Sequence, residues 1–600
     1  MFRKGKTQLK SLHRKVLYFA FLFVLVLWSS PSVFAAEPKY GDTFVVGIGS
    51  DPQSLNGAIS GSYFDKIVAS NIYSMLIRLD YDMNPVPDLA KEWTISDDGL
   101  TYTFELTPGV KWHDGTPMTP ADVKFTMEEM IFQYHPRAGI FSVIESIETH
   151  GENTVIFTLN KPFGPFLNLL AYDFFVLPMH LYEDTDIRNN PHNHSPVGTG
   201  PFIFEEWSRG SHITLVRNPD YFQEGLPYLD RLIFRVIPDA SSRVFALEAG
   251  EIHYLAYLAL PSSAVSEFSD NPDIVITTKG FESLASILML NLNLDIPELQ
   301  DVRVRRAIAM AIDRDYIVNH ADYGLGIPAN SPMASTSWAY EPEVTEYHFN
   351  PEAAAALLDE AGFTPGADGT RLTLRLSADA NVELNRQAGE IVKANLEEIG
   401  IRVDYEPVER GVMLDRVYVR RDFDMHIHGF STGSDPAIDI ARLYVSSNIR
   451  PVSFTNDAGY RNPIVDELFV KGEEASYPEQ RAVYYREIQR ILTDELPVIW
   501  LSEIGLVGAY HSRFHNVHSW SAYSYYIFWD VWSEAGQPAQ PAEAAQPAQP
   551  TQPVQPAQPA QPAQTAQPAT VSPTMIVGAI IVLVIVVRFV MKRKKSKDEE

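Results

Sequence analysis

The chain has 600 residues, a formal net charge of −28, 45% hydrophobic residues and no cysteine. Its acidic surplus repels nucleic-acid phosphates and anionic lipid headgroups, so neither is expected as a partner. Without cysteine, the chain can form no disulfide bond and carry no lipid-modified cysteine, so packing must stabilise the fold. Between the two terminal segments lie roughly 500 residues, too many for one hydrophobic core, which predicts two or three domains.

The N-terminus has the pattern of a secretory signal peptide. Basic residues up to Lys15 precede an apolar run from Val16 to Trp28, and small residues follow as far as Ala36. This order is typical of a signal cleaved after a small residue, so we expect cleavage after Ala35 and assign residues 1–35 to the signal. The alternative is an uncleaved membrane anchor.

The C-terminus has the pattern of a stalk and an anchor. Residues 535–570 consist mostly of Gln-Pro-Ala repeats, which favour an extended polyproline-II spacer, although such a tract could also bind a partner. Residues 571–591 are apolar enough for a transmembrane helix, and residues 592–600 form a basic tail expected in the cytoplasm. The pattern predicts a protein anchored at the cell surface with its main part outside, either extracellular or periplasmic.

The first part of the chain contains a predicted strand at Thr43–Gly49, followed by the sequence D-P-Q-S-L-N at Asp51–Asn56. The most informative stretch is Asp98–Val123. There Tyr102, Phe104 and Leu106 alternate with polar residues, which predicts a half-buried strand. The order Thr119, Pro120, Asp122 then predicts a helix that begins with a capping box.

Asp98–Val123 resembles the signature of the family 5 extracellular solute-binding proteins, which are receptor subunits of ABC importers for oligopeptides, dipeptides, nickel and some oligosaccharides. Further similar blocks, including Asp51–Asn56, Val197–Phe202 and Ser242–Leu255, extend the resemblance over most of Lys39–Trp532. The two glycines of Val197–Phe202 would allow a sharp backbone path.

The resemblance implies an α/β fold of the two-lobe periplasmic-binding-protein type, in its cluster C form with an extra inserted domain. Lobe I would comprise residues 36–56, 190–285 and 504–534. The inserted small domain would be residues 57–189, and lobe II residues 286–503. The chain would cross between the lobes near Phe281–Ile287 and near Ser502–Val507.

The second half of the chain shows clear signals of alternating helices and strands. Asp301 can cap a helix, and another helix runs from Asn350-Pro351 to Gly362. Residues 372–376, 401–405 and 423–430 are predicted strands, with a helix predicted at Glu383–Ile399. This alternation predicts a sheet covered by helices.

The segment Gly429–Gly433 matches the hydrolase pattern G-x-S-x-G, with Ser431 as the candidate nucleophile. That chemistry requires a strand that turns directly into a helix. Here the helix is predicted to start later, with Asp435 as its cap, so we interpret the segment as a ligand loop at the carboxyl end of a strand. His426 and His428 share a strand face, and His192 and His194 repeat the spacing in a loop. No cysteine or convincingly placed carboxylate completes a metal site, so we expect neither metal nor cofactor.

In the peptide-binding relatives an aromatic residue and an aspartate in this loop contact the ligand, and the aspartate pairs with the peptide amino terminus. The resemblance places Phe430 and Thr432 at these two positions. Thr432 cannot neutralise an ammonium group, which argues against recognition of a free amino terminus unless Asp435 or another acid substitutes. The residues that we expect to contact the solute are Ser50, Asp51, Tyr63, Asn291, Trp338, Phe430, Thr432 and Asp435.

These expectations define a monomeric receptor that is not an enzyme. It would capture a solute, in the first place an oligopeptide, between two lobes and deliver it to ABC permease subunits. An oligosaccharide is the alternative ligand, suggested by Thr432 and the 12% aromatic content. From other classes, Ser431 leaves a secreted serine hydrolase as an alternative, and a non-transporting sensor or adhesin would have the same fold.

Overall fold

The computed structural model describes residues 37–538, apart from residues 81, 256–258, 269, 282–283, 434 and 519–526. The predicted signal peptide, most of the Gln-Pro-Ala stalk, the transmembrane helix at 571–591 and the basic tail lie outside the described residues. Within the described part, no helix is both long enough and apolar enough to cross a membrane.

Lobe I is built on a mixed sheet with the strand order β13-β20-β12-β2-β11-β10-β9. The strands are β2 (Thr43–Ile48), β9 (Phe202–Ser208), β10 (His212–Arg217), β11 (Arg231–Val236), β12 (Tyr254–Leu255), β13 (Ile274–Thr277) and β20 (Gly508–His511). The predicted opening strand is therefore confirmed as β2, which pairs in parallel with β11 and β12. Because both faces of β2 are covered, Phe44 and Val46 are fully buried at the centre of the sheet.

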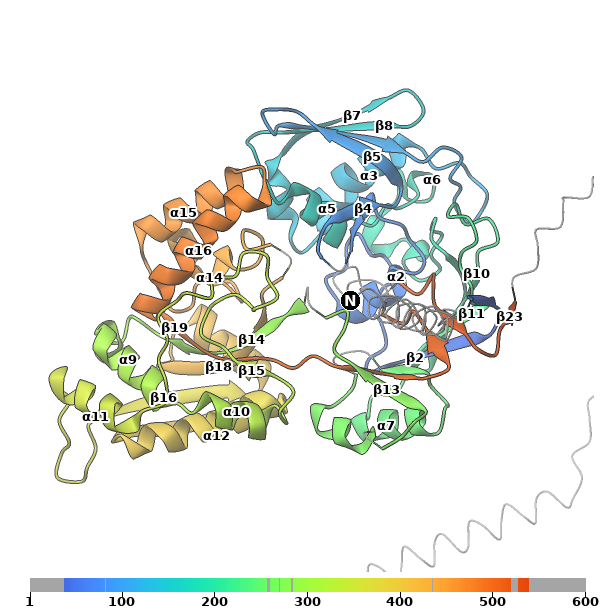
Figure 1. Cartoon of the computed structure of the whole chain (residues 1–600). Helices are drawn as coiled ribbons and strands as arrows, with labels where there is room; N and C mark the ends of the chain where they lie inside the picture. Colours follow the sequence, from blue (N-terminus) through green and yellow to red (C-terminus); the bar gives the residue numbers. More distant parts are fainter. Residues whose placement is uncertain are drawn as a thin grey trace, which may run out of the picture. The chain divides into compact units, whose positions relative to one another are not determined.

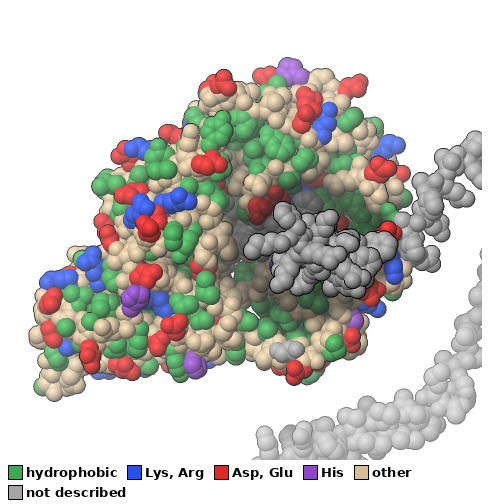
Figure 2. All heavy atoms as spheres, in the orientation of Figure 1, with side chains coloured by type: hydrophobic (Ala, Val, Ile, Leu, Met, Phe, Trp, Pro, Cys, Tyr) green, Lys and Arg blue, Asp and Glu red, His purple; other side chains and the backbone are tan. Residues whose placement is uncertain are grey.

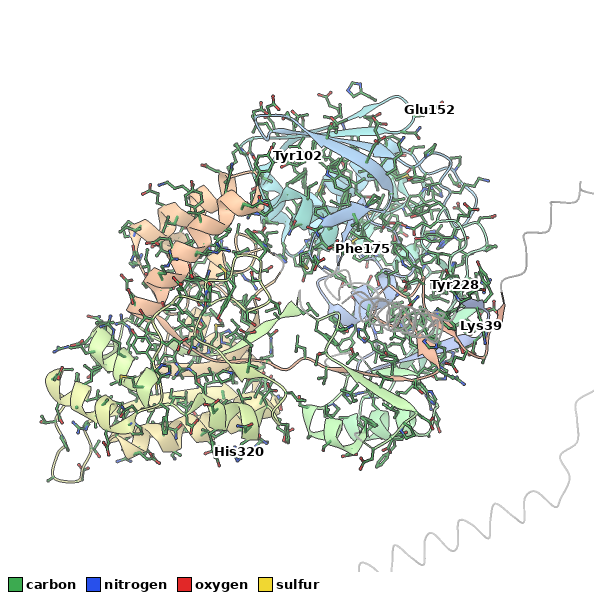
Figure 3. All side chains as sticks on the ribbon, in the orientation of Figure 1. Lys39, Tyr102, Glu152, Phe175, Tyr228 and His320 are labelled. Carbon is green, nitrogen blue, oxygen red and sulfur yellow. The ribbon has the colours of Figure 1, made fainter. Side chains whose placement is uncertain are left out.

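A smaller antiparallel sheet, of order β5-β6-β8-β7, lies beyond the first sheet in Figure 1. Its strands are β5 (Ala90–Ile95), β6 (Thr101–Leu106), β7 (Ile144–His150) and β8 (Thr154–Leu159). The buried side chains of β6 alternate as predicted, and Tyr102 packs 4.7 Å from the ring of Phe166. Figure 3 shows Tyr102 on this sheet and Glu152 at the tip of the β7–β8 turn. The apolar core beneath the small sheet is continuous with that of lobe I.

Helices α2 (Tyr63–Ala69), α3 (Pro120–Phe125), α4 (Phe132–Tyr134), α5 (Phe166–Asp173), α6 (Met179–Tyr182) and α7 (Ala240–Glu248) complete this half of the protein. The capping box predicted for α3 is confirmed, because the backbone N–H of Thr119 donates to the Asp122 carboxylate at 2.8 Å. Short strand pairs also form: β1 (Lys39–Tyr40) with β23 (Gln537–Pro538), β3 (Ile77–Leu79) with β4 (Pro85–Pro87), and β21 (Phe514–His515) with β22 (Trp532–Ser533).

Lobe II is built on a second mixed sheet with the order β15-β19-β14-β18-β16-β17. Its strands are β14 (Ser286–Leu292), β15 (Ile327–Pro328), β16 (Leu372–Asp379), β17 (Ile401–Val408), β18 (Met425–Ser431) and β19 (Val498–Glu503). Its helices are α8 (Pro297–Gln300), α9 (Val302–Ala311), α10 (Arg314–Ala321), α11 (Pro351–Glu360), α12 (Glu383–Glu398), α13 (Arg410–Leu414), α14 (Ala441–Tyr444), α15 (Pro463–Glu474) and α16 (Pro478–Glu495).

The local signals in lobe II predicted these elements well. Asp301 caps α9 by accepting from the N–H of Arg303, and Asn350 caps α11 with Pro351 in its first turn. Helix α12 begins at Glu383, as predicted. One expectation was wrong: residues 436–440 form turns, and the helix expected after Asp435 begins only at Ala441.

The chain passes between the two large sheets twice, from β13 to β14 and from β19 to β20 (Figure 1). The two connections run beside each other, because Ile504 N–H donates to the carbonyl of Ser286 at 2.7 Å. The first connection leads into β14 and the second leaves β19, and these two strands pair with each other in the lobe II sheet.

The two glycines of Val197–Phe202 have a different role from the one expected. Neither has a positive φ, but a Cβ at Gly198 would lie 1.8 Å from the carbonyl oxygen of Ile72, and one at Gly200 would lie 2.6 Å from the same atom. Glycine is required here because two backbone segments approach each other closely.

Acidic and basic side chains are interspersed over the face shown in Figure 2. Many of them form exposed ion pairs, such as Arg235 with Glu251 and Arg416 with Glu406. Such pairs add little stability individually, so the fold depends mainly on the cores of the two lobes.

Candidate functional site

The candidate site lies at the end of β18, beside the first connection between the lobes. The backbone N–H and the hydroxyl of Thr432 both donate to the carbonyl of Ala285, each at 2.8 Å. Because Ala285 precedes β14, these bonds fix the loop to the connecting segment. Thr432 is uncharged and its donors are engaged, so it provides no negative charge for a ligand ammonium group.

Gly433, which follows Thr432, occupies a position that only glycine can take. Gly433 has a φ of +65°, and a Cβ on it would lie 1.8 Å from Oδ2 of Asp439. Only glycine combines this backbone conformation with this close approach. The backbone at Gly433 is therefore packed directly against Asp439.

Asp435 forms a buried, bidentate ion pair with Arg481 of α16. Both carboxylate oxygens lie 2.6 Å from guanidinium nitrogens, and the two side chains are at most 4% exposed. Burial alone would lower the pKa of Arg481, but Asp435 raises it above its usual value. Trp338 joins the same cluster, with its ring 5.2 Å from the Arg481 guanidinium. Asp435 is thus neutralised within the protein, and the suggestion that it could replace the missing aspartate was wrong for this conformation.

Arg442, in α14, has no such partner. Its guanidinium lies 4.6 Å from the ring centroid of Phe430, and its buried Nε makes no hydrogen bond within the described part of the chain. The ring of Phe454 lies nearby, with its centroid 6.4 Å from that of Phe430 and 5.9 Å from that of Tyr418. The end of β18 therefore combines aromatic rings with an arginine that has no counterion among the described residues.

The loop after β18 also contacts the first half of the protein. Arg137 Nη2 lies 3.4 Å from Oδ1 of Asp439, and Ile438 is 3% exposed within the continuous apolar core of this first half. A second contact joins Gly164 N–H to the carbonyl of Glu473 at 2.8 Å. The site is accordingly placed where the two lobes meet.

Ser431 does not have the environment of a nucleophile. Its hydroxyl donates to the carbonyl of Leu284 at 3.1 Å and accepts from the N–H of Gly433 at 3.3 Å. No histidine bonds to it within the described residues. A strand-to-helix elbow is also missing, since turns follow β18. The serine-hydrolase alternative is therefore wrong.

His426 and His428 are buried with parallel rings, 4.9 Å apart between centroids. His426 Nε2 lies 2.7 Å from Oδ2 of Asp457, and His428 Nδ1 lies 3.0 Å from Nδ2 of Asn291. Burial, reinforced by His426, lowers the pKa of His428 to about 3, so His428 is neutral.

The two histidines and Asp457 place donor atoms within 4.8 Å of one another, which could hold a metal ion. Sequence reasoning missed Asp457 because it lies in an irregular loop 31 residues beyond His426. Hydrogen bonds within the protein account for one nitrogen of each histidine, whereas Nδ1 of His426 and Nε2 of His428 are buried without a hydrogen bond within the described part of the chain. His192 and His194 do not form a similar group: their Nδ1 atoms contact Ser195 O and Arg209 respectively.

The other predicted ligand contacts lie in different environments. Asn291 is 3% exposed within the lobe II sheet, so it cannot touch a solute in this conformation. Ser50 is exposed at the end of β2, and Asp51 accepts from Trp207 Nε1 at 2.9 Å and from Gly210 N–H at 3.1 Å. Tyr63 is half-buried at the start of α2, with its ring 5.5 Å from Phe64. Of the predicted contacts, Phe430 and Thr432 lie at the end of β18, and Trp338 is linked to Asp435 through Arg481.

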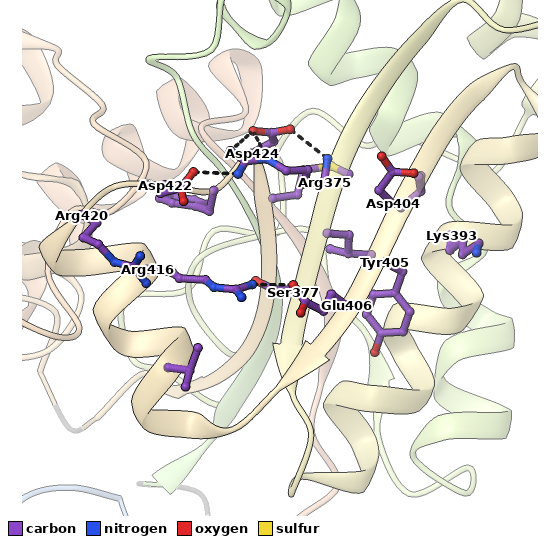
Figure 4. A pocket seen from close by; sticks show the side chains of 15 residues that line it. Arg375, Ser377, Lys393, Asp404, Tyr405, Glu406, Arg416, Arg420, Asp422 and Asp424 are labelled. Atoms are coloured by element: carbon purple, nitrogen blue, oxygen red, sulfur yellow. Dashed lines mark hydrogen bonds and ion pairs between the residues drawn. The ribbon is translucent and has the colours of Figure 1, made fainter.

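A separate cavity of about 690 Å³ lies on lobe II and is shown in Figure 4. Arg375 lines it and bonds to Asp424 at 2.8 Å and to Asp422 at 2.7 Å. Arg416 similarly bonds to Glu406 at 2.6 Å. These arginines are paired, and the lining includes none of the predicted ligand contacts.

Two mixed sheets joined by two connections, with a loop that contacts both halves, define a two-lobe solute-binding protein. Residues 84–450 match the model of the bacterial extracellular solute-binding proteins, family 5. The chain belongs to this family. It is a non-enzymatic solute-binding receptor of the kind that serves ABC importers.

The chain is similar to the oligopeptide-binding protein AppA of Bacillus subtilis, with 29% identity over 79% of this chain and 88% of that protein. It is 28% identical to the glutathione-binding protein GsiB of Salmonella typhi, over 78% of this chain and 90% of that one. Among solved structures, the periplasmic binding protein DppA of Helicobacter pylori in complex with the peptide STSA matches with a TM-score of 0.68 and 27% identity, covering 83% of this chain and 99% of that one.

Proposed function

We propose that this receptor closes its two lobes around a peptide and presents the closed form to an ABC permease. The observation that carries the proposal is the segment after β18, which follows a lobe II strand but buries Ile438 in the apolar core shared by lobe I and the small domain. A ligand held beside this loop would touch both lobes and would therefore favour the closed state over the open one. The named relatives that bind oligopeptides, glutathione and the peptide STSA support the ligand class.

We further propose the division of the chain given by its sequence. Lobe I would comprise residues 36–56, 190–285 and 504–534, the inserted small domain residues 57–189, and lobe II residues 286–503, as in cluster C of this fold. The separate four-stranded sheet supports an inserted unit, and the two connections between the large sheets support the lobe boundaries. The continuous apolar core indicates that the inserted unit moves together with lobe I.

The ligand would be held by groups around the end of β18. We propose Phe430 and Trp338 as packing surfaces, with Ser50, Asp51 and Tyr63 contributing from lobe I. Thr432 is engaged with Ala285, and Asp435 is paired with Arg481, so this loop does not hold a free amino terminus by an ion pair. The receptor would therefore accept peptides whose amino terminus lies elsewhere in the cleft or is blocked.

The terminal segments would place the receptor at the cell surface. A cleaved signal peptide would direct export, and the apolar segment at 571–591 with its basic tail would anchor the protein in the membrane. The Gln-Pro-Ala stalk would let the receptor reorient while it stays near the permease, which raises its effective concentration there.

Thermal unfolding of the purified chain tests the ligand class. Mixed-sequence peptides of two to nine residues should raise the unfolding midpoint in a dose-dependent manner, because a ligand at 100 times its dissociation constant stabilises the folded state by about 2.7 kcal/mol. Oligosaccharides and nickel ions provide the comparison arms. A shift with oligosaccharides and none with peptides would replace the proposal by the alternative ligand.

A further inference from the structure

Arg442 forms no ion pair with a carboxylate of the described residues. It follows the first residue of α14, and the centre of its guanidinium lies 4.6 Å from the ring centroid of Phe430. No carboxylate within the described residues lies close enough to form an ion pair with it, and its Nε is buried without a hydrogen bond. Arginine presents five donors in a planar fork, so leaving them unused near the interior is unfavourable.

The acids nearest to Arg442 are engaged by other groups. Asp439, three residues earlier, contacts Arg137 of the first half of the protein at 3.4 Å. Asp435 is bound by both nitrogens of Arg481, and Asp457 is bound by His426. Each of these carboxylates therefore has a cationic or hydrogen-bonding partner of its own.

The environment disfavours the charge on Arg442. Burial lowers the pKa of its guanidinium, Asp439 raises it, and Arg137 lowers it further. A bound anion would reverse this effect by supplying both a counterion and hydrogen-bond acceptors. The terminal nitrogens are not among the buried unpaired atoms, so they are accessible to such a group.

The aromatic residues beside Arg442 also have the character of a binding site. Phe454 has a φ of +61°, a conformation that is unfavourable for a bulky residue and that is concentrated at binding sites. Its ring faces Phe430 and His428 at centroid distances of 6.4 and 6.1 Å. Apolar rings around a guanidinium exclude water and strengthen its interaction with an anion.

We propose that Arg442 is the anion-binding residue of the solute site and that it selects ligands carrying a carboxylate, which it would bind bidentately beside Phe430. This inference rests on the proposed function as a peptide receptor. The positive charge of Arg442 would thus favour a ligand carboxylate rather than a ligand ammonium group. The carboxylate can be the carboxyl terminus of a peptide or an acidic side chain.

Three probe sets distinguish these sources in thermal-shift titrations of the purified full-length chain. They are a mixed tripeptide library without Asp or Glu as free acids, the same library as carboxyl-terminal amides, and the amides with one Glu added. The wild type should bind the free acids, the Glu amides or both about 10- to 100-fold more tightly than the acid-free amides, as expected for a charged hydrogen bond. Preference for the first set assigns the terminus, and preference for the third assigns the side chain.

Arg442→Gln should reduce this preference to less than about twofold while its midpoint without ligand stays close to that of the wild type. Arg442→Lys, which keeps the charge but loses the fork, should retain part of the preference. The matched control is Arg410→Gln, because Arg410 lies 5.6 Å from the ring of Phe454 but is paired with Asp379. It should keep the full preference.

Equal binding of acids and amides by the wild type would overturn the role of Arg442 and leave the peptide receptor intact. The role of Arg442 would be overturned in the same way if Arg410→Gln removed the preference as completely as Arg442→Gln. Wild-type protein that binds none of the three sets would instead overturn both this inference and the peptide proposal.

Discussion

The carboxylate of Asp435 and the guanidinium of Arg481 form a buried bidentate pair that fixes the segment after β18 to α16. Arg481 also donates to the carbonyl of Gly472 at 2.7 Å and to the hydroxyl of Tyr485 at 2.9 Å. Each of its three guanidinium nitrogens therefore has an acceptor, and such hydrogen bonding is the condition under which a buried ion pair is tolerated. It also explains why Asp435 is not available to a ligand.

Replacing Arg481 by Met should destabilise the protein by about 3–5 kcal/mol, because Asp435 would be left buried without its counterion. Urea-induced unfolding followed by tryptophan fluorescence would measure the loss as a lower midpoint at an unchanged slope.

The control for this variant is Arg235→Met. Arg235 pairs with Glu251, but the two side chains are 43% and 56% exposed, so the loss should be below about 1 kcal/mol. If both variants lost the same stability, the Asp435–Arg481 pair would not anchor the loop.

Most of the fold followed from signals that lie within a few residues of one another. The alternation of Tyr102, Phe104 and Leu106 predicted β6, and Asp301 marked the start of α9. Capping and alternation are local properties of the chain, so they can be recognised without knowledge of the fold.

The site depended on contacts between distant residues, which no local pattern reveals. Arg481 lies 46 residues after Asp435, and Ala285 lies 147 residues before Thr432. The sequence correctly indicated a loop at the carboxyl end of β18, but it could not show that Asp435 has a partner or that Arg442 has none among the described residues. The match of Ser431 to the G-x-S-x-G pattern misled for the same reason.

Gly198 offers a test of the close approach between two backbones. Gly198→Ala should lower stability by about 2 kcal/mol or more, because the new Cβ would overlap the carbonyl of Ile72. The free energy of unfolding measures this loss, and Gly139→Ala is the matched control. Gly139 has no positive φ and no atom near its Cβ position, so its variant should stay within about 0.5 kcal/mol of the wild type. Comparable losses in both variants would contradict the steric explanation.

Ser431→Ala should be mildly destabilising, by about 0.5–1.5 kcal/mol, because only the bonds to Leu284 and Gly433 are lost. A fluorophosphonate probe should fail to label the wild-type protein, since no base among the described residues activates the hydroxyl. Stoichiometric labelling that disappears in Ser431→Ala would restore the hydrolase interpretation.

Asp322 should make stability depend on pH through the second connection between the lobes. Its Oδ2 accepts from the N–H of Gly505 at 2.8 Å, whereas Oδ1 is buried without a partner in the described chain. Burial raises the pKa of this carboxyl to about 6, partly opposed by the Gly505 bond. Because the folded state holds the proton more tightly than the unfolded state, the contribution of Asp322 is fully present below about pH 4 and is lost as the pH rises through about 6.

Asp322→Asn keeps an acceptor for Gly505 and resembles the protonated acid at every pH. At pH 7.5 the variant should therefore exceed the wild type in stability by about 1–3 kcal/mol, and the difference should vanish near pH 4. Urea unfolding at both pH values measures it. Asp97→Asn, in the exposed turn before β6, provides the control and should give the same small difference at both pH values. A gain for Asp322→Asn that did not change between pH 4 and 7.5 would show that titration of this carboxyl does not affect the connection.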